Sequence, residues 1–246
     1  MPVIDKIDAG GYDYIDFGCK EGEMFERMKE EFGVSKGLGL DINEEHVRVC
    51  KKNGHDAEVQ DITKFEIFDT KKTRFVLMSH FLEHLFGYNE AKKCIHVACS
   101  LAKEFVYIRQ PFFDQDGYLF NLGLKLYFSN WSGHPNRMTS LEFHNILHPL
   151  LRDNIIKRFC IYYKQLIQDS YDLGIHPIIS PMNLHEYDVN KYPFKKYIVF
   201  DQKVYRDIIV LIFLNENHIS LPKDLEEEIG VATKVFDSYQ DILGYP

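Results

Sequence analysis

Short apolar runs alternate with segments of helical periodicity along most of this 246-residue chain. Runs of this length predict strands, and a continuously apolar run is typical of a strand covered on both faces. Strands that alternate with helices favour an α/β fold whose sheet is mostly parallel, with helices on both faces. The expected strands occupy residues 14–17, 37–42, 55–59, 74–79, 104–108, 155–167 and 207–214.

The segments between these runs carry helix signals. Residues 22–32 place their apolar side chains at helical spacing, and Asn43, Asn89 and Thr139 or Ser140 are candidate N-caps of three later helices. Near the end of the chain, Pro222 opens a segment with one apolar stripe, which predicts a helix over about 222–243 packed against the core. The stripe comprises Leu225, Ile229, Ala232, Phe236, Tyr239 and Leu243.

Composition is that of an ordinary globular protein, with 45% hydrophobic and 27% charged residues. We therefore interpret residues 1–246 as a single domain. Two stretches, 111–137 and 171–197, are long and irregular for connections inside a compact domain, which favours a functional role for both. The first of them is rich in aromatic residues.

The net charge of -8 disfavours long nucleic acids as partners, because no broad positive field attracts phosphates. The five cysteines form no C-x-x-C pair, which is typical of buried thiols in a reducing compartment. Neither a signal-peptide stretch nor an apolar run long enough to span a membrane is present. We expect a cytoplasmic protein, monomeric or homodimeric, that does not bind membranes. The cysteines are Cys19, Cys50, Cys94, Cys99 and Cys160.

The turn after the first expected strand reads Asp16-Phe17-Gly18-Cys19-Lys20-Glu21-Gly22. In open α/β sheets, ligands bind beyond the carboxyl ends of the strands. A glycine directly after the strand lets the backbone approach a ligand closely, and Gly22 lets the next helix pack tightly. The N–H groups at that helix start are donors for a carboxylate.

Acidic residues follow the second and third expected strands. Asp41 is suited to accept hydrogen bonds from a pair of ribose hydroxyls, and Asp61 from the amino group of adenine. Together with the first turn they indicate a nucleoside-containing ligand. A dinucleotide-binding dehydrogenase would also place an acid after the second strand. However, it requires G-x-G-x-x-G, and Gly18 to Gly22 reads G-x-x-x-G.

These residues resemble those of class I S-adenosylmethionine (SAM)-dependent methyltransferases, the broad group that includes ubiquinone-biosynthesis-type enzymes. The family's first turn reads acidic-x-Gly-x-Gly-x-Gly; Asp16, Gly18 and Gly22 match it, whereas Lys20 replaces the middle glycine. The resemblance implies a Rossmann-like, seven-stranded sheet with an antiparallel final strand, and SAM as cofactor with S-adenosylhomocysteine (SAH) as product. The implied cofactor-binding residues are Asp16, Phe17, Gly18, Cys19, Gly22, Asp41, Ile42, Asp61, Ile62, Ser79 and His80.

Two further segments extend the resemblance to about residue 150. Residues 75–85 resemble the family's fourth strand with its Leu-Glu-His-Leu end, and residues 133–140 resemble the segment that follows its fifth strand. We predict His134 and His80 as candidate catalytic residues, because imidazole exchanges protons near neutral pH. The candidate residues for binding the methyl acceptor are Glu83, His84, Arg109, Tyr118, Tyr127, Trp131 and Arg137.

Aromatic side chains interleaved with polar ones predict a pocket for a ring-bearing or sugar-like acceptor. The expected acceptor is a small polar molecule methylated on oxygen, such as a sugar, a nucleotide or a phosphate- or phosphoramidate-containing precursor. The chain also resembles bacterial methyltransferases that modify precursors of surface polysaccharides such as capsule. The alternatives are a quinone-like aromatic acceptor and a catalytically silent SAM-binding partner subunit.

Residues 80–84 match the metalloprotease pattern H-x-x-E-H. Zinc binding by that pattern needs both histidines on one continuous helix, together with a third ligand. Here the motif follows directly on an apolar strand, which places His80 at the strand end. We therefore expect no metal site of that kind.

Overall fold

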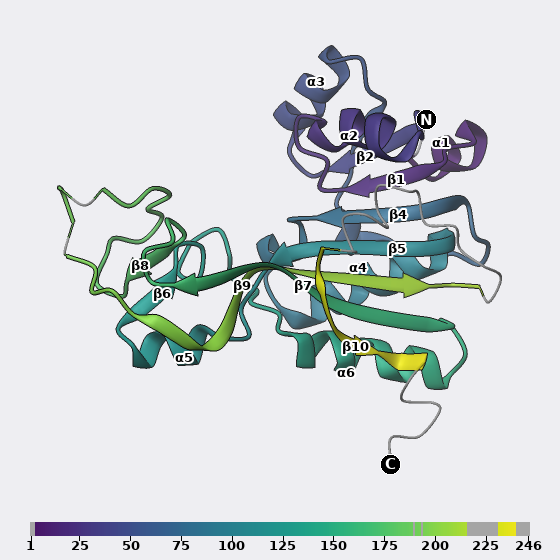
Figure 1. Cartoon of the computed structure of the whole chain (residues 1–246). Coiled ribbons are helices and arrows are strands. Elements are labelled where there is room, and N and C mark those ends of the chain that lie inside the picture. The colour runs from purple at the N-terminus through teal and green to yellow at the C-terminus, as the bar shows by residue number, and fades with distance from the viewer. Residues whose placement is uncertain (1–2, 189, 193, 216–230, 240–246) are drawn as a thin grey trace.

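The computed structural model describes residues 3–188, 190–192, 194–215 and 231–239. Its main sheet has eight strands in the order β10-β7-β9-β5-β4-β1-β2-β3 (Figure 1). The strands are β1 (Tyr14–Phe17), β2 (Gly37–Asp41), β3 (Ala57–Val59), β4 (Thr73–Ser79), β5 (Ala102–Pro111), β7 (Arg158–Asp169), β9 (Val199–Phe213) and β10 (Thr233–Asp237).

The strand directions confirm the predicted α/β fold. β3, β2, β1, β4 and β5 pair in parallel, β9 pairs antiparallel with both β5 and β7, and β7 therefore runs in the direction of β5. Because parallel strands end at the same edge of a sheet, the segments after β1, β2, β4 and β5 meet there. The seven expected strands are all present, and β10 adds an eighth beside β7.

The predicted C-terminal helix is wrong at residues 233–237, which form β10. Thr233 and Val235 are β-branched and favour a strand, and the edge of β7 offers unpaired backbone groups. Phe236 packs on Phe159 with ring centroids 5.0 Å apart. The apolar stripe coincided with helical spacing, but tertiary pairing decided the conformation. Leu225, Ile229, Leu243 and the rest of 216–230 and 240–246 lie outside the described residues.

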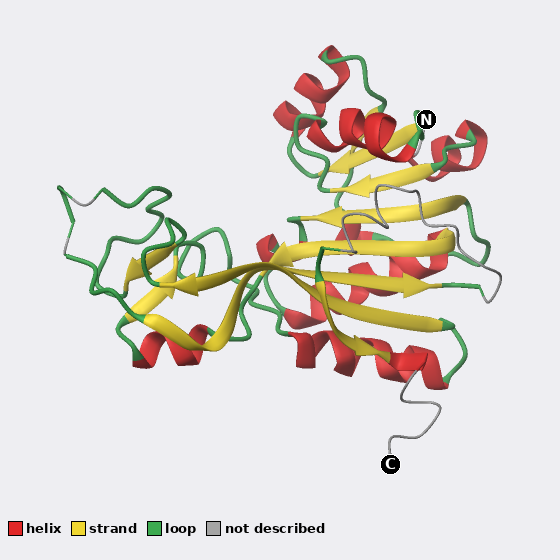
Figure 2. Ribbon diagram, viewed as in Figure 1, coloured by secondary structure: helices red, strands yellow, loops and turns green. Residues whose placement is uncertain are grey.

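Helices cover both faces of the sheet (Figure 2). The side chains of successive strand residues point to opposite faces, so Ile15, Val76 and Val106 belong to one apolar layer and Tyr14, Phe75 and Phe105 to the other. The first layer packs against α1 (Val3–Gly10), α4 (Tyr88–Leu101) and α6 (Ser140–Arg152), and the second against α2 (Glu23–Phe32) and α3 (Glu44–Lys52).

Two of the predicted caps are confirmed. The side chain of Asn43 accepts hydrogen bonds from the N–H groups of Glu45 and His46, and Thr139 forms a capping box with Glu142 at the start of α6. Asn89 is not a cap, because α4 begins one residue earlier, at Tyr88. These helix starts orient the loops that leave the carboxyl edge of the sheet.

The irregular stretches 111–137 and 171–197 together build a small lobe beyond that edge (Figure 1). It contains α5 (Asp116–Asn121) and a two-stranded sheet of β6 (Leu124–Leu126) and β8 (Ile175–Pro177), which pair antiparallel. β7 and β9 continue past the last β5 pair, Pro111 with Asp207, as a ribbon that reaches the lobe. The lobe therefore stands where a ligand at the strand ends would lie.

All five cysteines are free and buried, as the sequence predicts. Within the described ranges, no helix combines the length and the apolar character needed to cross a bilayer.

Candidate functional site

The turn between β1 and α2 adopts a conformation that requires glycine at two positions. Gly18 has φ 78°, and a Cβ there would lie 2.7 Å from Cδ2 of Phe81. Gly22 has φ 95°, and a Cβ there would lie 2.7 Å from Cδ2 of His55. Larger residues are therefore excluded by both conformation and space. Gly18 brings the backbone close to the pocket, whereas Gly22 packs α2 closely against its neighbours.

Lys20, which departs from the family's glycine pattern, keeps the glycine-like backbone. Its φ is 48°, in the left-handed region, and its side chain is exposed. The N–H of Lys20 donates to Oδ2 of Asp41 at 2.9 Å, and the N–H of Asn43 donates to Oδ1 at 2.9 Å. Asp41 therefore joins the ends of β1 and β2.

Asp16 lies beneath this turn and is only 1% exposed. Its Oδ2 has no hydrogen-bond partner among the described residues. Burial, together with the nearby charge of Asp41, raises the pKa of Asp16 to about 7. Asp16, like Phe17, Cys19 and Gly22, supports the turn from below and does not line the pocket.

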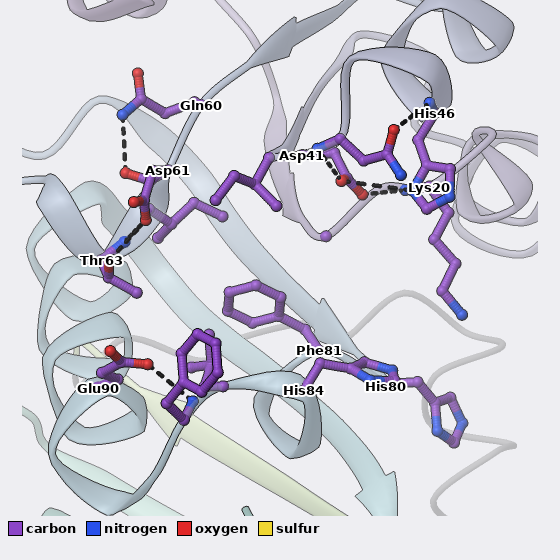
Figure 3. Close-up of a pocket in the computed structure, with 16 residues that line it drawn as sticks. Lys20, Asp41, His46, Gln60, Asp61, Thr63, His80, Phe81, His84 and Glu90 are labelled. Carbon is purple, nitrogen blue, oxygen red and sulfur yellow. Dashed lines mark hydrogen bonds and ion pairs between the residues drawn. The ribbon is translucent and has the colours of Figure 1, made fainter. Parts of the chain in front are cut away.

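A pocket of about 450 Å³ opens at the ends of β1, β2, β3 and β4 (Figure 3). Asp41 and Lys20 lie on one side of it and Asp61 on the other, with Phe81 between them. Six of the predicted cofactor residues line it, whereas Ser79 does not. The full lining is Gly18, Lys20, Asp41, Ile42, Asn43, His46, Gln60, Asp61, Ile62, Thr63, His80, Phe81, His84, Leu85, Phe86 and Glu90.

Asp61 is held in place by its own helical turn, Ile62–Lys64. Its Oδ1 accepts hydrogen bonds from the hydroxyl of Thr63 at 2.6 Å and from the Thr63 N–H at 3.1 Å. These hydrogen bonds and the ion pair with Lys64 hold the pKa of Asp61 below its ordinary value. The carboxylate is therefore an oriented acceptor facing the pocket.

Exposed apolar side chains stand at this pocket. Ile42 is 68% exposed and Phe86 is 90% exposed, although both are large and apolar. A flat aromatic ring seated between such side chains would remove apolar surface from water. Phe86, Leu85, Phe81 and Gln60 were not predicted from the sequence, because no local pattern distinguishes a pocket residue from a loop residue.

A second pocket, of about 400 Å³, adjoins the first on the side of the lobe. The two pockets share Lys20, His80 and His84. The second pocket contains most of the predicted acceptor residues together with His134. Its lining is Lys20, His80, Glu83, His84, Arg109, Pro111, Tyr127, Phe128, Trp131, His134, Gln165, His185, Arg206 and Asp207.

The two arginines of the second pocket are paired with carboxylates. Nε and Nη2 of Arg109 donate to Oδ2 of Asp207 at 3.1 and 2.6 Å, and Nη2 of Arg206 donates to Asp172 at 2.7 Å. Gln165 has φ 59° at the point where the β7–β9 ribbon leaves the sheet, and it projects into this region. The pocket is thus polar, with its arginines already oriented by carboxylates.

Two predicted acceptor residues line neither pocket. The hydroxyl of Tyr118 accepts a hydrogen bond from the N–H of Asp201 at 3.1 Å, because α5 packs its aromatic ring against Phe200. Arg137 is exposed on the surface. Their positions in the sequence are close to those of pocket residues, but the turns of the lobe direct them elsewhere.

His185 is a pocket residue that the sequence did not single out. Its ring lies 5.1 Å from that of Tyr127 and 5.6 Å from that of Trp131, measured between centroids. It comes from the 171–197 stretch, whose irregular length was the only signal of a functional role. The Nε1 atom of Trp131 is buried and has no hydrogen-bond partner within the described structure.

The histidines at the junction of the pockets are held by backbone and carboxylate groups. Nδ1 of His80 lies 3.2 Å from Oε1 of Glu83, and Nδ1 of His84 lies 2.7 Å from the carbonyl oxygen of Gly133. Nδ1 of His134 lies 3.2 Å from the carbonyl oxygen of Phe128. Burial lowers the pKa of His134, so its ring is neutral at pH 7.

Known proteins similar to this chain are methyltransferases. A family model described as a methyltransferase domain matches residues 15–104. A SAM-dependent methyltransferase from Archaeoglobus fulgidus superposes with a TM-score of 0.53 at 18% identity, over 86% of this chain and 89% of that one.

A second solved structure is the plantazolicin methyltransferase BpumL in complex with a pentazolic desmethylPZN analog and SAH. It has a TM-score of 0.50 and 14% identity, over 83% of this chain and 77% of that one. At these identities the likeness is one of fold. A search of the curated proteins finds no match.

Proposed function

We propose that this chain is a SAM-dependent methyltransferase of the class I superfamily, and that it methylates an oxygen of a small polar acceptor such as a sugar or a nucleotide. The observation that carries the proposal is the junction of the two pockets at Lys20, His80 and His84. Methyl transfer needs the acceptor oxygen in line with the sulfonium methyl, at roughly 3 Å. Two adjoining pockets with a shared wall supply that arrangement.

The first pocket is suited to SAM. Asp41 stands where the ribose hydroxyls would be bound, Asp61 faces the adenine amino group, and Ile42 and Phe86 offer apolar surface to the ring. SAM is already activated by its positive sulfur, so the protein's task is to position the two reactants. The turn at Gly18 supports this proposal by letting the backbone approach the ligand.

The second pocket favours a hydroxylated acceptor. Arg109, Arg206, Gln165, Asp207 and His185 bring both donors and acceptors to its wall. Because the guanidinium of Arg109 is already paired with Asp207, a phosphate-bearing acceptor would have to compete with that carboxylate. A hydroxyl of a sugar, or of the ribose of a nucleotide, can instead use the mixed donors and acceptors as they stand.

A proton must leave the acceptor hydroxyl. As its oxygen forms the bond to the methyl carbon, the carbon–sulfur bond breaks and its electron pair stays on sulfur, which yields SAH and a methyl ether. His80 lines both pockets, and Oε1 of Glu83 orients its ring through Nδ1. We assign the proton to Nε2 of His80, in line with its predicted role.

One observation favours a quinone-like aromatic acceptor as the second candidate. The rings of Tyr127 and Trp131 lie edge to face at 5.7 Å on the same pocket, where a flat ring could stack. Trp131→Ala should then reduce kcat/KM more than Arg206→Ala does. The reverse order is expected for a hydroxylated acceptor held by polar contacts.

Calorimetric titration with SAM, SAH and NAD tests the cofactor assignment. We expect SAM and SAH to bind with one site per chain and NAD to give no heat of binding. Binding of NAD instead would overturn the proposal. Isotope-labelled SAM with a panel of sugars, nucleotides and quinones then identifies the acceptor. If SAM binds but no acceptor is labelled, a silent SAM-binding subunit becomes the better description.

A further inference from the structure

Three side chains with metal-binding atoms lie close together in the wall of the second pocket. Methyl transfer by itself does not require such a group. We propose that Glu83, His84 and His134 bind one divalent transition-metal ion in the wall of the acceptor pocket. The H-x-x-E-H pattern does not form the helical protease site, since His80 sits at the strand end with φ 51°. The fold instead brings the Glu-His pair of that pattern against His134, which lies far along the chain.

The ligand atoms of the three residues converge. One nitrogen from each histidine and one carboxylate oxygen all lie within 4.8 Å of one another. Three ligands bound at about 2.1 Å in tetrahedral positions lie about 3.4 Å apart, so binding requires the atoms, now within 4.8 Å of one another, to approach by up to about 1.4 Å. Side-chain rotation supplies such a shift without movement of the backbone.

Both imidazoles are oriented with a lone pair directed away from the backbone. The carbonyl oxygens of Gly133 and Phe128 can only accept hydrogen bonds, so Nδ1 of His84 and Nδ1 of His134 carry the protons. Nε2 of each ring is therefore unprotonated. Metal-ligating histidines characteristically donate their second ring N–H to a carbonyl or carboxylate in this way.

Glu83 supplies the negative charge and an unsatisfied atom. It is only 1% exposed, and its Oε2 is buried without a hydrogen-bond partner among the described residues, whereas Oε1 faces His80 at 3.2 Å. A buried carboxylate oxygen without a partner is destabilising unless a cation compensates it. A bound ion would do so at Oε2.

The backbone holds these residues together before any ion binds. Nδ2 of Asn136 donates to the carbonyl oxygen of Leu82 at 2.9 Å, and the N–H of Asn136 donates to that of Glu83 at 3.3 Å. The segment that carries His134 is thus fastened to the segment that carries Glu83 and His84. This reduces the entropy lost when the ligands are brought around an ion.

Two imidazoles and one carboxylate suit ions from Mn²⁺ to Zn²⁺ and leave coordination positions open toward the pocket. An acceptor hydroxyl bound at an open position would lose its proton more easily, because a metal ion lowers the pKa of a coordinated oxygen. That role rests on the proposed function, but ion binding itself does not. In this arrangement His134 orients the acceptor through the ion rather than taking its proton.

Mn²⁺ is the probe for the test, since its paramagnetic resonance signal separates free from bound ion. Full-length protein, stripped with a chelator and dialysed, is titrated with MnCl₂ and, in parallel, with SAH. We expect one Mn²⁺ per chain, and a loss of affinity of at least about 10-fold in Glu83→Gln, His84→Ala and His134→Ala. The control is His148→Ala, on α6 beside His144, which should leave Mn²⁺ affinity unchanged.

Absence of stoichiometric Mn²⁺ binding, or binding that all three variants retain, would overturn the metal site. SAH titration keeps this result separate from the cofactor assignment. Binding of SAH without binding of Mn²⁺ would support the proposed function and contradict the metal site. Binding of Mn²⁺ without binding of SAH would support the metal site and contradict the proposed function. A variant that binds SAH like the wild type is folded, so its loss of Mn²⁺ affinity reports on the ligand itself.

Discussion

The main-chain N–H of Lys20 donates a hydrogen bond to Oδ2 of Asp41 over 2.9 Å. This contact ties the turn after β1 to the end of β2, the two segments that would hold the ribose and the methionine part of SAM. It also explains how the turn keeps its shape although a lysine occupies the family's middle glycine position. The backbone of Lys20 takes the left-handed conformation, and the hydrogen bond to Asp41 helps to hold it there.

Lys20→Gly should be more stable than Lys20→Ala by about 1 kcal/mol, because only glycine adopts φ near 48° without strain. Both variants lose the lysine side chain, so their difference isolates the backbone conformation. Urea unfolding followed by circular dichroism measures it. Equal stabilities would show that the turn is not left-handed at this position in solution.

Asp41→Asn should weaken SAH binding by about 1–3 kcal/mol. The amide keeps one acceptor oxygen but loses the charge that accepts from two ribose hydroxyls. Calorimetric titration gives the change in affinity. Asp153→Asn, an exposed carboxylate at the end of α6, is the matched control and should bind SAH like the wild type.

Gly18→Ala should abolish measurable SAH binding and lower the free energy of unfolding by at least about 1–2 kcal/mol. The added Cβ combines φ 78° with a position 2.7 Å from Phe81, so the turn must shift. Gly117→Ala, where nothing lies within 4 Å of the new Cβ, provides the comparison. Unimpaired SAH affinity in Gly18→Ala would argue against this turn as the cofactor site.

We expect the free energy of unfolding of the ligand-free protein to fall as the pH rises from about 4 to about 7, because Asp16 loses its proton over this range. The pKa of Asp16 is raised from 3.8 to about 7 in the folded protein, so the folded state binds the proton more tightly than the unfolded chain. The stability that this proton contributes is complete below pH 3.8 and is lost by about pH 7. Three pKa units correspond to up to about 4 kcal/mol.

Asp16→Asn removes this titration and should flatten the pH profile of unfolding across the same range. Denaturant unfolding at several pH values, for both proteins, measures the difference. Parallel profiles for the wild type and Asp16→Asn would show that Asp16 titrates normally in the folded state.

His185→Ala should impair use of the acceptor while leaving SAH affinity unchanged, because His185 lines only the second of the two pockets. Once an acceptor is known, steady-state kinetics should show a raised KM for it. Calorimetry with SAH is the control measurement. A loss of SAH affinity would place His185 in the cofactor site and contradict the division into two pockets.

The sequence by itself predicted six of the residues that line the first pocket. Asp16 lies near the end of β1, Asp41 ends β2 and Asp61 follows β3. Because the carboxyl ends of parallel strands share an edge, local pattern was enough to place the three near one another. The positions of seven strands along the chain followed from the same short-range periodicity, and the buried cysteines from the absence of a C-x-x-C pair. The left-handed backbone of Lys20 could not be predicted from the residue type, because contacts with neighbouring residues impose it.

Only the tertiary structure decided the acceptor side. It brought His134 against Glu83 and His84, added His185 from an irregular stretch and turned Tyr118 and Arg137 away. It also made a strand of residues 233–237, where periodicity had indicated a helix. These features depend on contacts between segments distant along the chain, which follow from loop packing and sheet-edge pairing rather than from any local repeat. Short-range pattern carries no information about such contacts.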